Sequence, residues 1–274
     1  MSVDVAAYPG AALGHGFMGR AALVTGASAG LGEEFARLLA ADGCDLILVA
    51  RRRDRLEQLA AELRESRRIS ALVIAADLGR ADEVERVIEE VRAAGSPVEF
   101  LINNAGHGNV AVFAQSDLAA QLSMVDVNVR ALVRLTHAFL PEMISRGRGR
   151  ILNIGSTAGF QPGPGAAVYY ASKAFVNSFT EALSYELKGT GVTATLSCPG
   201  ATATEFASVA GSGGTRLFKS GVMSSSRVAA EAYRAMLQGR PMVVHGWRNK
   251  LLGFSVRLGP RSVVRAIAAS YNRA

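Results

Sequence analysis

Cysteine and histidine are scarce in this sequence. Among its 274 residues there are two cysteines, Cys44 and Cys198, and they form no CxxC pair. Two thiols cannot build a disulfide framework, so a reducing, cytoplasmic compartment is expected. The four histidines are scattered without the spacing of metal ligands, and therefore no metal site is predicted.

A signal peptide and a long apolar run are also missing. The N-terminus has no basic stretch followed by an apolar core, and glycines interrupt it. Residues 1–19 are therefore expected to form a flexible leader. Near the C-terminus, arginines interrupt every apolar run before it reaches the roughly 20 residues that a bilayer-spanning helix needs.

Acidic residues are absent after Glu231. The formal net charge is +7, but the last 43 residues hold eight basic side chains, which leaves 22 basic and 23 acidic residues before them. Because the body is almost neutral, the charge does not indicate nucleic-acid binding. The tail, residues 247–274, has the pattern of a basic amphipathic segment. Such a helix can lie on an anionic membrane surface, although packing against the body or a second subunit is its commoner use.

What the sequence does contain is an alternation of short apolar runs with helical segments. The predicted strands span residues 21–25, 45–50, 71–76, 98–102, 150–154 and 192–197. This alternation predicts an α/β protein with a single domain at residues 20–246. The domain is expected to be a Rossmann-type doubly wound parallel sheet with helices on both faces. Ligands of such a sheet bind at the carboxyl ends of its strands.

The first predicted strand ends in a glycine cluster, residues 25–32. Gly26 would let the backbone turn, Gly30 would let it approach a pyrophosphate, and Gly32 would let the following helix pack on the strand. The N-terminus of that helix offers free N–H groups and the positive end of its dipole to phosphates. Glycine-rich turns that bind nothing are common, so this turn alone leaves both interpretations open.

Arginines follow the second predicted strand. Ala50 precedes Arg51, Arg52 and Arg53, at the place where a dinucleotide fold meets the adenosine ribose. An acid there would bind the 2′-hydroxyl of NAD, whereas a basic residue would accept the 2′-phosphate of NADP. NADP(H) is therefore favoured, with Arg51 as the first choice for the phosphate and Arg52 as the second. At least one of the three is expected to be only a solvated helix start.

An acid–base centre is predicted between Ser156 and Lys173. Tyr169 and Lys173 are four residues apart, so a helix places both on one face. A neighbouring ammonium is expected to lower the pKa of the phenol from about 10 toward the range useful for proton transfer. Prolines and glycines between Ser156 and Tyr169 force a loop that would return the serine hydroxyl to the same site. Asn128, in an apolar-periodic helical segment at about 117–146, is either a satisfied kink residue or part of the site.

In their order and spacing, these motifs resemble the short-chain dehydrogenase/reductase family over about residues 20–245. The matching stretches are TGASAGLG at 25–32, DL at 77–78, NNAG at 103–106, Asn128, Ser156, YYASK at 169–173 and PGATAT at 199–204. The resemblance points to Tyr169 as the catalytic tyrosine, because Tyr170 lies only three residues before Lys173.

The resemblance implies that NADPH delivers a hydride to a carbonyl carbon while Tyr169 donates a proton to the oxygen. Ser156 would stabilise that oxygen, Lys173 would lower the pKa of Tyr169 and bind the nicotinamide ribose, and Asn128 would hold a water between Lys173 and solvent. The cofactor-binding residues implied by the resemblance, besides Tyr169, Lys173 and the two arginines, are Gly26, Ser28, Gly30, Leu31, Asp77, Leu78, Asn104, Ala105, Gly106, Pro199, Gly200, Thr202 and Thr204.

Residues 205–227 are predicted to form a mobile lid over a small, largely apolar substrate; a plain surface loop is the alternative. The expected inner face of the lid is Phe206, Leu217, Phe218, Val222 and Met223. Phe160, Gln161 and His107 are expected to line the same pocket.

The predicted function is an NADPH-dependent oxidoreductase that reduces a carbonyl or oxidises the matching alcohol. A catalytically idle NADP(H)-sensing regulatory protein would need the glycine turn but not the acid, so the complete set of Asn128, Ser156, Tyr169 and Lys173 favours the enzyme. A nucleotide-sugar epimerase would share the tyrosine and lysine chemistry but would usually have a C-terminal substrate domain larger than the tail of this chain. The expected partners are a small-molecule substrate and further copies of the chain, in a homodimer or homotetramer. Nucleic acid is not expected as a partner.

Overall fold

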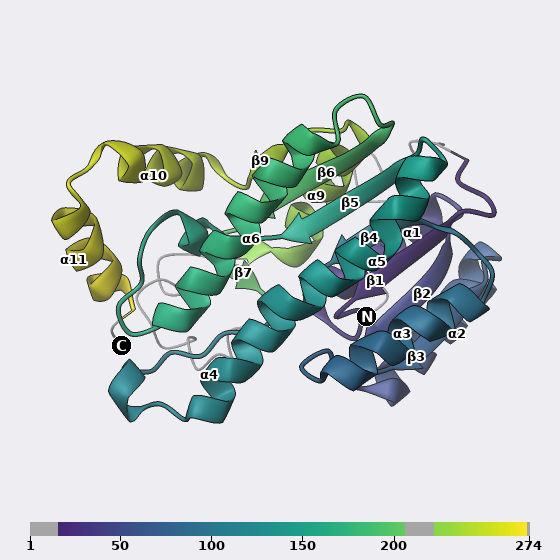
Figure 1. Cartoon of the computed structure of the whole chain (residues 1–274), viewed down its shortest axis with the longest axis horizontal. Helices are drawn as coiled ribbons and strands as arrows, with labels where there is room; N and C mark the ends of the chain where they lie inside the picture. The colour runs from purple at the N-terminus through teal and green to yellow at the C-terminus, as the bar shows by residue number, and fades with distance from the viewer. Residues whose placement is uncertain (1–15, 206–221, 273–274) are drawn as a thin grey trace.

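Seven parallel strands form the central sheet of the computed structural model, which describes residues 16–205 and 222–272 (Figure 1). The strands are β1 (Ala21–Thr25), β2 (Asp45–Ala50), β3 (Ala71–Ala75), β4 (Val98–Asn103), β5 (Gly149–Ile154), β6 (Val192–Cys198) and β9 (Met242–Val244). Their spatial order is β3-β2-β1-β4-β5-β6-β9, so the direction of winding reverses between β1 and β4. This arrangement confirms the predicted doubly wound fold.

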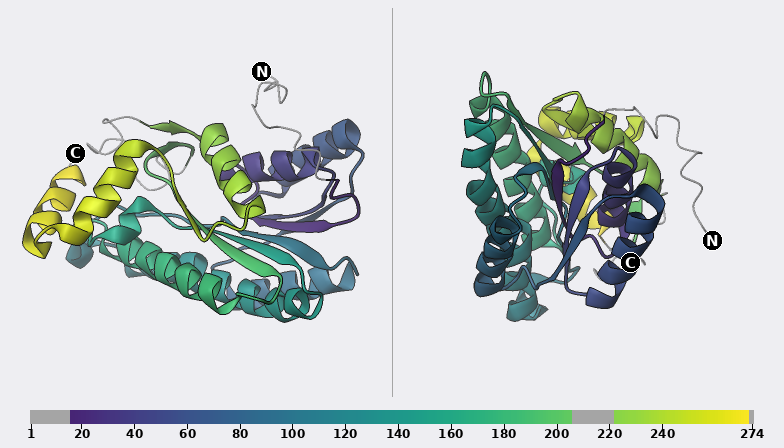
Figure 2. Two further views of the ribbon diagram at one scale, coloured as in Figure 1. Left: turned by 90° about the horizontal axis from the view of Figure 1, so that it is seen from above. Right: turned by 90° about the vertical axis from the view of Figure 1, so that its right-hand side faces the viewer.

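Helices cover both faces of this sheet (Figure 2). One face carries α1 (Gly30–Ala41), α2 (Arg53–Arg67) and α9 (Ser225–Leu237), and the other carries α3 (Ala81–Ala93), α5 (Leu132–Ser145) and α6 (Ala167–Glu186). Each helix buries one apolar stripe, such as Phe35 and Leu39 of α1 or Val84 and Ile88 of α3, because residues three and four apart share a helix face. Apolar strands buried on both faces follow from this three-layer packing.

Two parts of the fold go beyond the predicted elements. The seventh strand, β9, is half-buried and only three residues long, so its apolar run, Met242–Val244, is too short to predict a strand. A separate pair, β7 (Thr202–Ala203) and β8 (Met223–Ser224), joins the two sides of the predicted lid. The long helical segment also divides into α4 (Leu118–Val125), a π-helical turn η3 (Asp126–Ala131) and α5.

The ends of the described chain segments bear on two predictions. Most of the leader, together with Phe206, Leu217 and Phe218 of the predicted lid, lies outside the described residues. Phe17 belongs to the predicted leader, yet its ring packs 5.0 Å from that of Phe100, between centroids. Its amide also donates to the Asp42 carbonyl at 3.0 Å. The packed part of the chain therefore includes residues before 20.

The tail forms two helices, α10 (Trp247–Leu258) and α11 (Arg261–Tyr271), at the end of the molecule toward which the strands point (Figure 1). A buried polar network fixes the start of α10. His245 contacts Ser197 through Nε2 and Glu231 through Nδ1, both at 2.9 Å, and the His245 carbonyl accepts from Asn249 at 2.8 Å. Among the described residues, no helix has both the length and the apolar composition needed to cross a membrane.

Candidate active site

A cavity of about 430 Å³ opens at the carboxyl ends of the strands, where β1 and β4 diverge. Of the predicted site residues, all except Asn128 line it. They are Gly26, Ser28, Gly30, Leu31, Arg51, Arg52, Asp77, Leu78, Asn104, Ala105, Gly106, Ser156, Tyr169, Lys173, Pro199, Gly200, Thr202 and Thr204. The parallel sheet explains this convergence, because it delivers the ends of distant strands to one edge.

The glycine turn leaves backbone space for a phosphate group. Gly26 and Gly30 have φ of +67° and +58°, which side-chain-bearing residues rarely adopt. A Cβ on Gly32 would lie 2.2 Å from the Gly26 carbonyl oxygen, so the turn can close onto α1 only with glycine there. Helix α1 begins at Gly30, and its N-cap residue, Ala29, has no side chain that could cap the free N–H groups. This turn therefore fits the pyrophosphate of a dinucleotide.

Thr25, the first residue of the glycine cluster, ties this turn to the end of β4. Its hydroxyl donates to the Ile102 carbonyl at 3.1 Å and accepts from the amides of Asn104 and Ala105 at 3.0 Å each. The Asn104 side chain donates back to the Thr25 carbonyl at 2.9 Å. The motif TGASAGLG includes this threonine, but its sequence does not indicate that the hydroxyl bonds to the loop after β4.

Arg52 is the arginine that the structure ties to the glycine turn. Its Nε and Nη2 lie 3.3 and 3.2 Å from Ser28 Oγ, and its Nη1 lies 2.8 Å from Glu205 Oε2. Arg51 also lines the cavity but is exposed. Arg55, which the sequence analysis did not consider, donates to the other oxygen of Glu205 at 2.6 Å. Of the two arginines, Arg52 is thus the one that contacts the turn, and their ranking as ligands of the 2′-phosphate stays a prediction.

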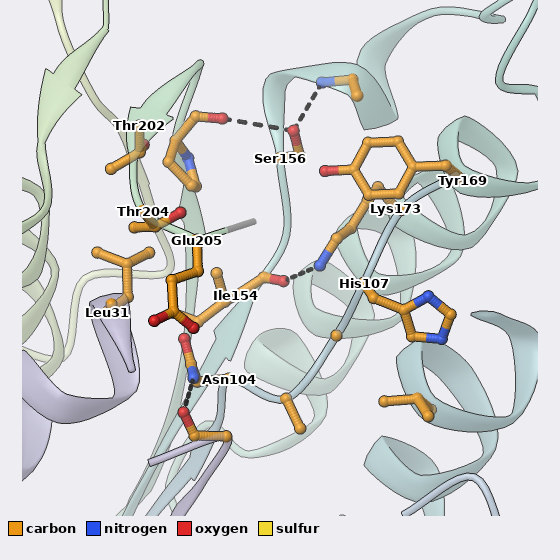
Figure 3. A pocket seen from close by; sticks show the side chains of 18 of the residues that line it. Leu31, Asn104, His107, Ile154, Ser156, Tyr169, Lys173, Thr202, Thr204 and Glu205 are labelled. Atoms are coloured by element: carbon orange, nitrogen blue, oxygen red, sulfur yellow. Dashed lines mark hydrogen bonds between the residues drawn. The ribbon is translucent and has the colours of Figure 1, made fainter. Parts of the chain in front are cut away.

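Tyr169, Ser156 and Lys173 face one space at the inner end of the cavity (Figure 3). Helix α6 carries Tyr169 and Lys173 on one face, as their spacing predicted. Ser156 follows β5, and its hydroxyl lies 3.4 Å from the Pro199 carbonyl and accepts from the Ala158 amide at 3.1 Å. The Lys173 ammonium is buried and donates to the Ile154 carbonyl at 2.8 Å.

The pKa of Tyr169 is raised, contrary to the expectation that Lys173 would lower it. Burial raises it to about 12, and a hydrogen bond with Ser156 acts in the opposite direction. Burial also lowers the pKa of Lys173 to about 8. The expectation was wrong because spacing along a helix does not report the loss of water around the phenol and the ammonium. The phenol is accordingly protonated at neutral pH and able to donate.

Asn128 lies behind the cavity wall, 2% exposed, in the π-helical turn. Its amide nitrogen donates to the His107 carbonyl at 2.9 Å and to Ser172 Oγ at 3.0 Å, and its oxygen accepts from the His107 amide at 3.0 Å. Asn128 is therefore both a satisfied helix-irregularity residue and a brace between the loop after β4 and helix α6. Gly106 lies against it, since a Cβ there would be 3.0 Å from Asn128 Oδ1.

The substrate end of the cavity includes a residue from the tail. Asn272 Oδ1 accepts from the Tyr170 hydroxyl at 3.0 Å, and its Nδ2 donates to the Pro164 carbonyl at 2.9 Å. His107 and Gln161 line the cavity as predicted, and burial lowers the pKa of His107, which favours a neutral imidazole. Phe160, in contrast, does not line the cavity. A Cβ on Gly253 of α10 would lie 3.1 Å from its ring, so Phe160 supports the tail instead.

The fold, the glycine turn and the convergent tyrosine, serine and lysine define a dinucleotide-dependent α/β oxidoreductase. The family model described as short chain dehydrogenase matches residues 20–213, and the chain belongs to that family. Sulfoacetaldehyde reductase 2 of Chromohalobacter salexigens is 45% identical over 186 residues, which are 67% of this chain and 73% of that protein.

Two solved structures give the same result. A short-chain dehydrogenase from Sphingobium yanoikuyae in complex with NADPH superimposes with a TM-score of 0.78 at 32% identity, covering 90% of this chain and 96% of that one. A bulky-bulky ketone specific alcohol dehydrogenase from Comamonas testosteroni has a TM-score of 0.74 at 30% identity, covering 90% and 95%. The chain is an NADP(H)-dependent oxidoreductase acting on CH–OH/C=O groups, which confirms the predicted enzyme and cofactor.

Proposed function

We propose that Tyr169 is the proton donor of this reductase and that Ser156 and Lys173 support it. The observation that carries the proposal is a protonated phenol, hydrogen-bonded to Ser156 inside the cavity and four residues from a buried ammonium. Bound NADPH supplies the hydride. As the carbonyl oxygen gains negative charge, the phenol protonates it and the Ser156 hydroxyl donates to it. Asn128 keeps α6 and the loop after β4 in register.

The proposed cofactor contacts divide the cavity into three parts. Gly26, Gly30 and Leu31 would bind the pyrophosphate, Arg52 the 2′-phosphate, and Thr202 and Thr204 the nicotinamide side. Two observations support this division: all six residues line one cavity, and the glycine turn after β1 lies between Arg52, which follows β2, and the two threonines, which follow β6. Asp77 and Leu78 would lie beside the adenine, and Asn104 to Gly106 along its ribose. The substrate would be a small, largely apolar carbonyl compound with one polar group. His107, Asn109, Gln161 and Asn272 offer hydrogen bonds to that group.

The test is consumption of NADPH by the full chain with a panel of aldehydes, ketones, steroids, quinones and acyl thioesters, with NADH as the control cofactor. We expect turnover of at least one carbonyl class and faster turnover with NADPH. The proposal fails if the chain binds NADPH tightly and turns over no carbonyl in the panel; that result would instead support the sensing protein. Sulfoacetaldehyde belongs in the panel because a relative is named for it.

We also propose that the exposed face of the tail contacts an anionic membrane surface. Trp247, Leu251, Phe254 and Leu258 of α10 are spaced by three or four residues and are 60–73% exposed, so they form one apolar stripe. Val263, Ile267 and Tyr271 form a second exposed stripe on α11. Arg248, Lys250, Arg261 and Arg265 are exposed on the same two helices, with no acidic residue after Glu231.

Charge favours lipid over a second copy of the chain as the occupant of this face. A two-fold interface that paired one tail with another would place like charges opposite each other, with no acid in either tail to neutralise them. Each basic side chain near an anionic bilayer would instead contribute about 1 kcal/mol. Among the described residues, helix α10 contacts the body on its opposite face, around Asn249 and Gly253.

Cosedimentation of the full chain with vesicles checks this proposal. We expect binding to vesicles that contain phosphatidylglycerol, weak binding to pure phosphatidylcholine, and release as salt is raised. The double substitution Leu251→Ser, Phe254→Ser should abolish binding, whereas Leu118→Ser, Leu122→Ser on the exposed face of α4 should not. No binding by the unmutated chain would end the proposal. Loss of self-association in the α10 variant would assign the face to a second copy.

A further inference from the structure

The Glu205 carboxylate forms ion pairs with two arginines, Arg52 and Arg55, at the proposed adenosine end of the cavity. Its Oε2 is 2.8 Å from Arg52 Nη1, and its Oε1 is 2.6 Å from Arg55 Nη1. Both arginines and Glu205 are 40–46% exposed, so water and solutes can reach the cluster. Arg52 and Glu205 line the cavity, and Arg52 is held at the glycine turn through Ser28. Arg55 lowers the pKa of Glu205 most, followed by Arg52, so the carboxylate is charged at neutral pH.

A carboxylate and a phosphate bind a guanidinium in the same way, through oxygen atoms that accept its N–H groups. Arg52 is the second residue after β2, and the end of this strand is where the fold receives the 2′-phosphate of NADP. The groups of Arg52 that would bind a phosphate are therefore the groups that now bind Glu205. Glu205 itself comes from the far side of the sheet, two residues after β7, and the sequence gives no indication that it meets Arg52.

We propose that Glu205 determines the cofactor preference of this chain by competing with the 2′-phosphate for Arg52 and Arg55. To bind NADP(H), the carboxylate must give up at least one arginine. To bind NAD(H), which has no 2′-phosphate, it keeps both. Glu205 therefore weakens NADP(H) binding selectively and narrows the preference for NADP(H) over NAD(H). The inference rests on the proposed placement of the 2′-phosphate at Arg52.

The expected effect follows from the exposure of the cluster. Solvent-exposed ion pairs are weak, so losing one or both should change affinity by about two- to ten-fold and not by orders of magnitude. Glu205→Gln keeps the size of the side chain and removes its charge. We expect it to bind NADPH about two- to ten-fold more tightly, with an unchanged dissociation constant for NADH.

The test measures binding without turnover. Titration calorimetry with 2′,5′-ADP and with 5′-AMP, which differ only in the 2′-phosphate, is run on the full chain and on Glu205→Gln, Arg52→Met and Glu57→Gln. Glu57 is a matched control, because it is an exposed acid on α2 that pairs with Arg53 at 3.5 Å and does not line the cavity. We expect Glu205→Gln to tighten 2′,5′-ADP only, and Glu57→Gln to change neither ligand measurably.

The outcomes separate this inference from the proposed phosphate site. If Arg52→Met leaves the ratio of the two affinities unchanged, the placement of the 2′-phosphate at Arg52 is wrong. If Arg52→Met lowers the ratio but Glu205→Gln leaves it unchanged or lowers it, the phosphate site stands and the competition is overturned. An equal gain in Glu57→Gln would show a general effect of net charge, which would also overturn it.

Discussion

Tyr169→Phe is expected to lower carbonyl turnover by roughly 10²–10⁴-fold, the range in which a positioned general acid acts. Phenylalanine keeps the ring in place and removes only the hydroxyl that would protonate the substrate oxygen. The dissociation constant for NADPH should change little, since the glycine turn and Arg52 are untouched. The measurement is kcat with the best carbonyl of the panel, together with NADPH binding by fluorescence.

Tyr170→Phe is the matched control for this prediction. The two tyrosines are adjacent, with ring centroids 6.0 Å apart, and both line the cavity. The Tyr170 hydroxyl, however, donates to Asn272 at 3.0 Å, and its ring is clamped where a Cβ on Gly163 would come within 2.2 Å. Tyr170→Phe should therefore alter KM more than kcat. Retention of most activity in Tyr169→Phe, or a larger loss of kcat in Tyr170→Phe, would refute the assignment.

Lys173→Met is expected to lower turnover by about 10²-fold or more, because it removes a positive charge held beside the developing negative charge. The unmutated enzyme should show a pH dependence with the same origin. Lys173 has a pKa of about 8, so kcat/KM for reduction should fall as pH rises through about 8 and the ammonium loses its proton. The phenol, with a pKa of about 12, adds no limb at lower pH.

The lowered pKa of Lys173 also predicts the direction in which the free energy of unfolding changes with pH. Its pKa lies below the ordinary value of 10.5, so between about pH 8 and pH 10.5 the unfolded chain binds more protons at this group than the folded chain. The free energy of unfolding should therefore gain a contribution that increases with pH across that window. Melting curves of Lys173→Met should lack this contribution, whereas Lys188→Met, which replaces an exposed lysine over Tyr185, should keep it.

The same variant also tests the pH dependence of catalysis. A decline of kcat/KM near pH 8 that persists in Lys173→Met would show that another group causes the decline.

Much of the site was predictable because its residues are tied to elements that the sequence specifies locally. Gly26, Gly30 and Gly32 are required by backbone conformations that other residues do not adopt easily. Tyr169 and Lys173 share a helix face by spacing alone. Since parallel strands bring their carboxyl ends to one edge, motifs that follow different strands could be assigned to one cavity before any contact was known.

Other residues were missed because no local pattern marks them. Glu205 was assigned only to the predicted lid and Asn272 only to the tail, and the partner that each meets at the cavity is more than 100 positions away in the sequence. Thr25 resembles any strand-ending threonine until its hydroxyl is seen to hold the loop after β4. Strand β9 has only three apolar residues, a run too short to predict a strand.

The sequence by itself determined the doubly wound sheet, the family, the cofactor class and many of the residues that line the site. Periodicity and glycine placement are local properties, so they can be read along the chain. Only the tertiary structure decided which arginine is held at the glycine turn, that Asn128 braces α6, and that the raised pKa of Tyr169 keeps its phenol protonated at neutral pH. Each of these depends on burial or on contact between distant segments. A side chain's loss of water is set by what packs around it, and spacing along the chain does not contain that information.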